Sequence, residues 1–142
     1  MMNSKLTACD SFKGALTSAQ ANSIISRVLR SQGWETRSFT IADGGEGTVD
    51  AIYRARGGRL CVARVHDGLG HMRDVQFLML DAHTAVIETA SVAGLPQYGP
   101  SLDHALCSNT YGIGELLLTA MNHGARTIYI GLGGSSSRDA GM

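Results

Sequence analysis

The 142-residue chain carries 12 Lys and Arg against 12 Asp and Glu, and 44% of its residues are hydrophobic. This neutral balance gives no electrostatic case for nucleic acid or an anionic membrane as a partner, and the composition is globular rather than disordered. No window approaches the 18 apolar residues of a membrane span, and the start is too short for a signal-peptide core, so we expect a cytoplasmic protein. The cysteines, Cys9, Cys61 and Cys107, show no metal or disulfide spacing and are expected to be reduced.

The first part of the chain alternates predicted strands and helices. Strands are expected at 6–9 and 34–41, and helices at 18–32 and 48–56. The first helix is predicted from apolar residues at helical spacing: Ala21, Ile24, Ile25, Val28 and Leu29. This order favours a parallel sheet with crossover helices, in which ligands bind at the carboxyl ends of the strands.

The pattern changes near residue 59. Consecutive strands at 60–65, 71–80 and 84–88 predict an antiparallel meander and hence a second lobe. Residues 90–108 are expected to be irregular, followed by a helix that opens at Thr110 and a strand at 127–130. We expect an α/β fold with a first, parallel-sheet lobe in residues 1–60 and an incomplete second lobe in residues 61–142.

The stretch from Ile41 to Thr48 combines glycines, two carboxylates and a hydroxyl just before a predicted helix. Glycines allow close approach of a ligand, and the N–H groups at the start of a helix attract an anion. Asp43 and Glu46 would oppose a bare anion, but they suit Mg²⁺ placed between them and a phosphate. A tight turn without a ligand is the alternative interpretation.

Other loops carry the same kind of residues. In the loop 10–14, Lys13 either binds a phosphate or is solvated. The segment Thr110-Tyr111-Gly112 either caps its helix or holds an anion on the N–H groups of residues 111–114.

The glycine- and serine-rich segment 131–141 is either a flexible end or an anion-binding loop with Asp139 as a base or metal ligand. Glu88, at a predicted strand end, is either a buried, partnered carboxylate or a site residue. A glycine-rich loop after a parallel strand normally leads into a helix, and the chain stops at Met142, so we expect a fragment.

The common nucleotide and hydrolase motifs are absent from the sequence. It contains no G-x-x-x-x-G-K-[ST], no G-x-G-x-x-G leading into a dinucleotide-binding unit and no G-x-S-x-G. Its five histidines form no i, i+4 metal pair, and each is interpreted as an ordinary surface or turn residue.

Five segments, taken in order, resemble the bacterial two-domain glycerate kinase family. They are Asp10–Gly14, Ala42–Thr48, Ala85–Glu88 with Gly94-Leu95, Asn109–Leu116, and Gly131–Ser136 with Asp139. The resemblance implies ATP-dependent phosphorylation of D-glycerate to a phosphoglycerate with Mg²⁺. It also implies an α/β fold in which a second lobe is inserted into the first, with the site in the cleft between them. The family's chain is longer, so this one is expected to be an N-terminal fragment, inactive or incomplete.

The resemblance also supplies candidate site residues. The catalytic candidates are Asp43, Lys13, Asp10 and Asp139. The substrate- and phosphate-binding candidates are Ser11, Gly44, Gly45, Gly47, Thr48, Thr110, Tyr111, Gly112, Gly133, Gly134, Ser135 and Ser136. The metal candidates are Asp43 and Glu46.

Two other functions compete with a kinase. One is a non-catalytic remnant that binds a nucleotide or a small acid. The other is a nicotinamide-binding oxidoreductase lobe, which rests on the parallel α/β topology alone. The sequence leaves open which glycerate hydroxyl would be phosphorylated and what the oligomeric state is.

Overall fold

The computed structural model describes residues 4–12, 14–94 and 102–139, apart from the side chains of residues 104 and 105. The chain forms two compact units, Met1–Ala42 and Asp43–Met142. The expected α/β class is confirmed. No helix in these described ranges has the length and apolar character needed to cross a membrane.

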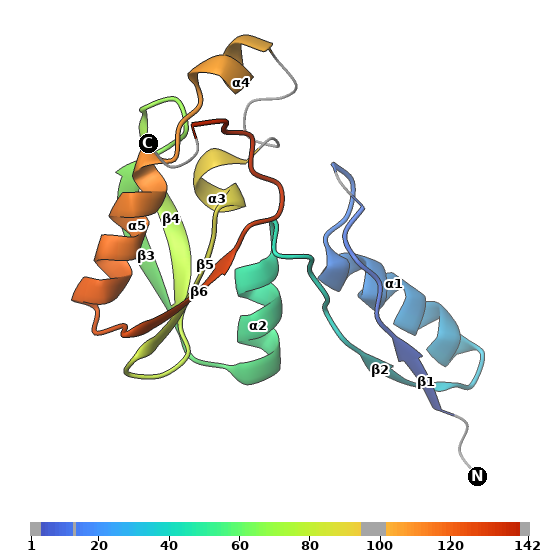
Figure 1. Ribbon diagram of the computed structural model, residues 1–142. Helices are drawn as coiled ribbons and strands as arrows, with labels where there is room; N and C mark the ends of the chain where they lie inside the picture. Colours follow the sequence, from blue (N-terminus) through green and yellow to red (C-terminus); the bar gives the residue numbers. More distant parts are fainter. Residues whose placement is uncertain (1–3, 13, 95–101, 140–142) are drawn as a thin grey trace. The chain divides into compact units, whose positions relative to one another are not determined.

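The first unit is a parallel pair of strands with one crossover helix (Figure 1). It consists of β1 (Ser4–Thr7), α1 (Ser18–Ser31) and β2 (Glu35–Ser38). Helix α1 begins at a capping box, in which Thr17 and Gln20 each accept a hydrogen bond from the other's backbone N–H. The predicted strand–helix–strand order is therefore confirmed, although β1 begins and ends two residues earlier than expected and β2 is shorter than expected.

Helix α1 packs on the strands through a polar face. Its buried residues are Ser18, Ala21, Asn22 and Ser26, whereas Ile24, Ile25 and Val28 are exposed. The Asn22 amide Nδ2 donates to the Cys9 carbonyl at 2.9 Å, and Asn22 Oδ1 accepts from the Cys9 N–H at 3.0 Å. Because Cys9 pairs with the helix in this way, β1 ends before it.

The second unit holds the remaining elements. They are α2 (Thr48–Arg56), β3 (Arg59–His66), β4 (Met72–Met79), β5 (Thr84–Glu88), α3 (Ala90–Ala93), α4 (Leu102–Cys107), α5 (Tyr111–Asn122) and β6 (Thr127–Gly131). The strand order is β3-β4-β5-β6. The first three strands form the predicted antiparallel meander, and β6 is parallel to β5 (Figure 1).

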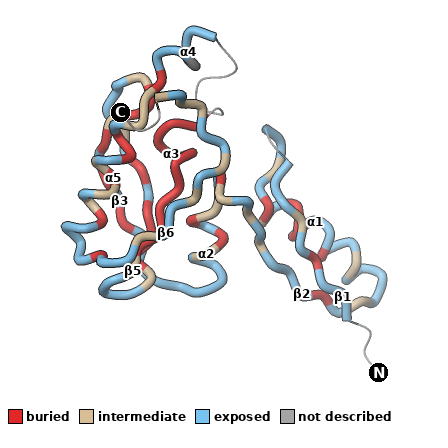
Figure 2. Tube along the Cα trace, in the orientation of Figure 1, coloured by how far each residue is buried: buried red, intermediate tan, exposed pale blue. Residues whose placement is uncertain are grey.

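Alternating side chains bury both faces of this sheet. Phe77 and Ile87 belong to the larger cluster, which includes Leu116 of α5. The intervening residues Leu78 and Val86 pack with Val49 of α2 on the other face. Figure 2 shows the buried residues concentrated along β3, β4, β5 and α3. The period-2 pattern of the strands thus places a helix on each face.

One expectation for the second unit differs from the structure. Residues 90–108 are not wholly irregular, because α3 and α4 form there; helices of four and six residues are too short to show a helical period. Pro96 and Pro100 lie outside the described residues. The two compact units divide after Ala42, because α2 packs on β4 and β5. The lobe boundary at residue 60 stays a prediction.

We expect Asn22→Ala to lower the free energy of unfolding by about 1–3 kcal/mol, because it removes the acceptor of the Cys9 N–H and one of the two donors to the Cys9 carbonyl, the other being the Ser18 hydroxyl. Urea denaturation of the whole chain measures the change. Ser23→Ala, an exposed substitution in the same helix, is the control and should stay within about 0.5 kcal/mol of the parent. Equal stability of the two variants would contradict the structural role of Asn22.

Candidate functional site

The loop from Asp43 to Thr48 is held by short internal hydrogen bonds. Asp43 Oδ1 accepts from the Gly45 N–H at 2.9 Å, and Thr48 Oγ1 donates to the Gly45 carbonyl at 2.8 Å. Gly47 has a φ of 91°, a value that side-chain-bearing residues rarely adopt. Asp43 and Glu46 are both exposed. The loop thus presents two accessible carboxylates from a backbone of defined shape.

A second glycine loop, residues 131–135, packs directly on this loop. The Gly133 N–H donates to the Gly44 carbonyl at 3.0 Å. A Cβ atom at Gly131 would lie 2.5 Å from the Gly44 carbonyl oxygen, and one at Gly133 would lie 2.6 Å from the Gly45 nitrogen. Only glycine permits this contact, so two segments far apart in the sequence form one backbone-lined wall.

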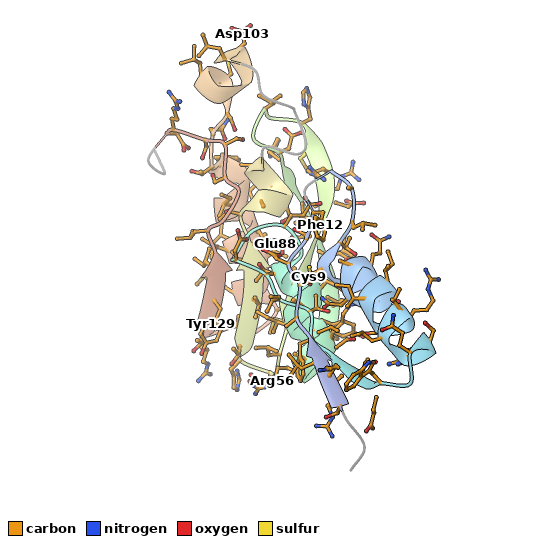
Figure 3. All side chains as sticks on the ribbon, turned by 90° about the vertical axis from the view of Figure 1, so that its right-hand side faces the viewer. Cys9, Phe12, Arg56, Glu88, Asp103 and Tyr129 are labelled. Carbon is orange, nitrogen blue, oxygen red and sulfur yellow. The ribbon has the colours of Figure 1, made fainter. Side chains whose placement is uncertain are left out.

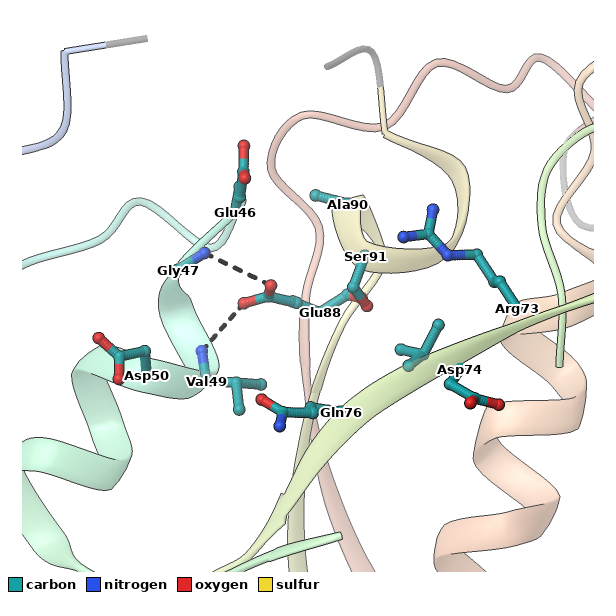
Figure 4. Close-up of a pocket in the computed structure, with 11 residues that line it drawn as sticks. Glu46, Gly47, Val49, Asp50, Arg73, Asp74, Gln76, Glu88, Ala90 and Ser91 are labelled. Carbon is teal, nitrogen blue, oxygen red and sulfur yellow. Dashed lines mark hydrogen bonds between the residues drawn. The ribbon is translucent and has the colours of Figure 1, made fainter. Parts of the chain in front are cut away.

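The N-terminus of α2 is occupied by Glu88, at the end of β5 (Figures 3 and 4). Its Oε2 accepts from the Val49 N–H at 2.9 Å and its Oε1 from the Gly47 N–H at 3.4 Å. Burial raises the pKa of Glu88 above its usual value, while hydrogen bonds from the N–H groups of Val49, Gly47 and Thr48 oppose that rise. Of the two interpretations from the sequence, the structure supports a buried, partnered carboxylate.

The N-terminus of α5 is occupied in the same way by Asp139. Its Oδ2 accepts from the Thr110 N–H at 2.6 Å and from the Thr110 hydroxyl at 2.8 Å. The N–H of Tyr111 donates to Asn109 Oδ1. Gly112 touches β3 so closely that a Cβ would overlap the His66 carbonyl oxygen. The Thr110 hydroxyl therefore binds Asp139 rather than capping α5 itself, and close packing on β3 accounts for Gly112.

The remaining candidates of the second unit lie on the second glycine loop. Gly134 has a φ of 72°, and Ser135 is exposed. The N–H and hydroxyl of Ser136 both donate to the Ala93 carbonyl at 2.9 Å. These bonds attach the loop to α3 and leave Ser135 accessible.

Asp10 and Ser11 belong to the first unit. Both are exposed, and Asp10 Oδ1 accepts from the Ser11 N–H at 2.6 Å. Phe12 and Leu16 close the loop through backbone hydrogen bonds. Lys13, the predicted phosphate contact, lies outside the described residues.

A polar cavity of about 370 Å³ lies beside α2 within the second unit (Figure 4). Its polar lining includes Glu46, Asp50, Arg73, Gln76, Glu88 and Ser91. The sequence interpretation missed Arg73, Gln76 and Ser91. Arg73 and Gln76 stand in a strand without any motif, and only the pairing of β4 with β5 brings them near Glu88.

A hydrogen-bonded pair between His66 of β3 and Glu115 of α5 was also missed. Glu115 accepts from the His66 backbone N–H at 2.7 Å and lies 2.9 Å from His66 Nδ1. The backbone N–H of His66 is the main cause that lowers the pKa of Glu115, and the His66 side chain adds to it. The two residues are 49 positions apart, so no local pattern marks the pair.

The carboxylates of the first glycine loop, residues 43–48, are suitable ligands for a magnesium ion that also binds phosphates. Within residues 4–12, 14–94 and 102–139, no three His, Cys, Asp or Glu side chains gather into a metal-binding group. Mg²⁺ in phosphate sites commonly uses one or two carboxylates, with phosphates and water as its other ligands. Asp43 and Glu46 are accessible and meet that smaller requirement.

The chain belongs to the glycerate kinase family, whose model matches residues 5–142. It is 37% identical to a glycerate kinase from Halalkalibacterium halodurans over 99% of its length, and 38% identical to one from Bacillus subtilis over 96%. A crystal structure of a protein described as glycerate kinase 2 from Salmonella typhimurium LT2 superposes with a TM-score of 0.75 at 34% identity, over 99% of this chain. The chain spans 38%, 36% and 38% of these three proteins.

Gly133→Ala should lower the free energy of unfolding by about 1–3 kcal/mol, because the added methyl group would collide with the backbone of Gly45. Gly114→Ala is the matched control. Its Cβ meets nothing within 4 Å and it lies inside α5, so it should be neutral or stabilise the chain by up to about 1 kcal/mol. Thermal unfolding of both variants measures the difference, and a Gly133→Ala variant as stable as Gly114→Ala would refute the close contact.

Glu115→Gln should cost about 1–2 kcal/mol of unfolding free energy at pH 7, because a charged acceptor for the His66 N–H becomes neutral. A carboxyl whose pKa is lowered by folding stabilises the fold above its unfolded pKa and loses that contribution as the pH falls. The difference between parent and variant should therefore shrink toward pH 3. Urea denaturation at pH 3 to 7 measures this difference in unfolding free energy, and a difference independent of pH would contradict stabilisation by the charged Glu115.

Proposed function

We propose that this chain forms part of an ATP-dependent glycerate kinase site, which transfers a phosphoryl group to a hydroxyl of D-glycerate. The observation that carries the proposal is the packed pair of glycine loops that presents the exposed carboxylates of Asp43 and Glu46. Membership of the glycerate kinase family supports it, as do relatives whose names carry that activity.

Phosphoryl transfer depends on positioning and charge neutralisation more than on covalent chemistry by the protein. The two glycine loops suit that task because their backbones have no side chains to keep phosphates away. Asp43 and Glu46 would hold Mg²⁺, which supplies positive charge to the phosphates. Alternatively, Asp43 would accept the proton of the glycerate hydroxyl, the role of a general base. Lys13 would provide a cation for phosphate or for the substrate carboxylate.

The N-terminal ends of α2 and α5 are poor candidates for phosphate binding, because carboxylates of the chain already lie there. Glu88 and Asp139 already accept hydrogen bonds at the starts of α2 and α5. A second anion at either end would lie beside a carboxylate and be repelled. The phosphates would therefore bind the glycine-loop backbones and the proposed metal, rather than the helix ends.

The direct test is to mix the purified chain with MgATP and D-glycerate and follow ADP release. ADP release that requires D-glycerate would support the kinase and defeat the alternative of a non-catalytic binding remnant. Binding of either ligand without turnover would favour the remnant. A chimaera in which this chain replaces the matching segment of the Bacillus subtilis relative supplies the rest of the relative's length, and we expect it to turn over D-glycerate.

Asp43→Asn in that chimaera should lower kcat by about 10²-fold or more if Asp43 is a base or a metal ligand. Asp81→Asn is the matched control, because Asp81 lies in the turn before β5, at the opposite end of that strand from Glu88, and should leave kcat unchanged. A near-normal rate for Asp43→Asn would remove Asp43 from the proposed chemistry.

A further inference from the structure

Glu88 is a buried carboxylate with a specific pair of partners. It is 8% exposed, and its two oxygens accept from the backbone N–H groups of Gly47 and Val49 at the start of α2 (Figure 4). Burying a carboxylate is unfavourable unless hydrogen bonds compensate for the lost water. The position is therefore defined closely by these two bonds.

Helix α2 has no cap of its own. Its N-cap residue is Gly47, in a left-handed conformation and without a side chain, whereas Ser, Thr, Asp or Asn at this position would bond the helix N–H groups locally. The cap comes instead from a residue 41 positions away. The same two hydrogen bonds that cap the helix thus connect the first glycine loop to the end of β5.

The next residue along the chain holds the other glycine loop. The Thr89 N–H donates to the Gly131 carbonyl at 2.9 Å. The Glu88 carbonyl in turn accepts from the Ser91 hydroxyl at 2.7 Å, which fixes the backbone where β5 turns into α3. Residues 88 and 89 therefore hold both glycine loops against the same strand end.

We infer that Glu88 is a positioning residue that sets the conformation of the loop carrying Asp43 and Glu46. Its carboxylate does not need to touch a ligand for this role, because it acts through the N–H groups of Gly47 and Val49. What the loop binds rests on the proposed function. The hydrogen bonds by which Glu88 holds the loop do not depend on it.

The test compares Glu88→Ala and Glu88→Gln in the full chain by hydrogen exchange of ¹⁵N-labelled protein. In Glu88→Ala the amides of Gly47 and Val49 should lose their acceptor and exchange about tenfold faster, and the amides of Gly44 to Glu46 should shift. Glu88→Gln keeps a neutral acceptor oxygen and should recover part of the protection. Amides inside α5 should keep their protection in both variants.

Glu115→Gln is the matched control, because it alters another carboxylate that accepts from a backbone N–H in the same unit. It should change the amide exchange of His66 and leave the amide exchange of Gly47 and Val49 as in the parent.

Equal loss of protection across the sheet in Glu88→Ala and Glu88→Gln would mean a general loss of stability and would overturn the inference. Unchanged exchange at Val49 would overturn it as well. If Glu88→Ala does not fold, the same comparison of amide exchange is made with Glu88→Gln and Glu88→Asp, and it tests the inference in the same way.

Line broadening by Mn²⁺ tests the functional part separately. In the parent chain Mn²⁺ should broaden the amide signals of Asp43 and Glu46, and Glu88→Gln should require a several-fold higher Mn²⁺ concentration for the same effect. No broadening in the parent would remove the proposed metal role, whereas the exchange data would still decide the role of Glu88. Equal Mn²⁺ titrations in parent and variant, despite faster exchange at Val49, would restrict Glu88 to capping α2 and so overturn its positioning role.

Discussion

The second unit depends on a contact between two backbones that only glycine allows. Gly131 and Gly133 lie so close to Gly44 and Gly45 that a single added carbon at either position would enter the other segment. This contact joins the loop before α2 to the loop after β6, at the carboxyl end of the parallel pair β5 and β6. Side chains of any size would separate the loops, and the exposed carboxylates of Asp43 and Glu46 would lose their common support.

Carboxylates of the chain itself satisfy the helix ends that border this wall. Glu88 caps α2 and Asp139 caps α5, each from a distant part of the sequence. The N–H groups that sequence reasoning assigned to a bound anion are thus partly used within the fold. The arrangement resolves the apparent conflict of acidic residues in a proposed phosphate-binding region, because the acids differ in burial and hydrogen bonding. Glu88 and Asp139 hold helices, while Asp43 and Glu46 remain accessible.

Local patterns predicted most elements. The predicted meander and the helix predicted after Thr110 correspond to elements that pack in one core, and α2 begins and ends where expected. Prediction was less successful where the local signal was weak or misleading. The apolar residues Ile24, Ile25 and Val28 correctly indicate a helix, yet that helix packs through Asn22 and Ser26. Hydrogen bonds to β1 and its following loop, which no periodicity reveals, decide which face is buried.

The sequence by itself determined the family and the α/β class, because these depend on residue types at short spacing, and for the same reason it predicted a site at residues 43–48. The tertiary structure decided which distant residues form hydrogen bonds with one another. Glu88 with Val49, Asp139 with Thr110, and Glu115 with His66 are separated by 39, 29 and 49 positions. Strand pairing and helix packing decide which residues form hydrogen bonds across such sequence separations. No local rule could therefore have assigned Glu88 to a helix cap or placed Arg73 in the same cavity.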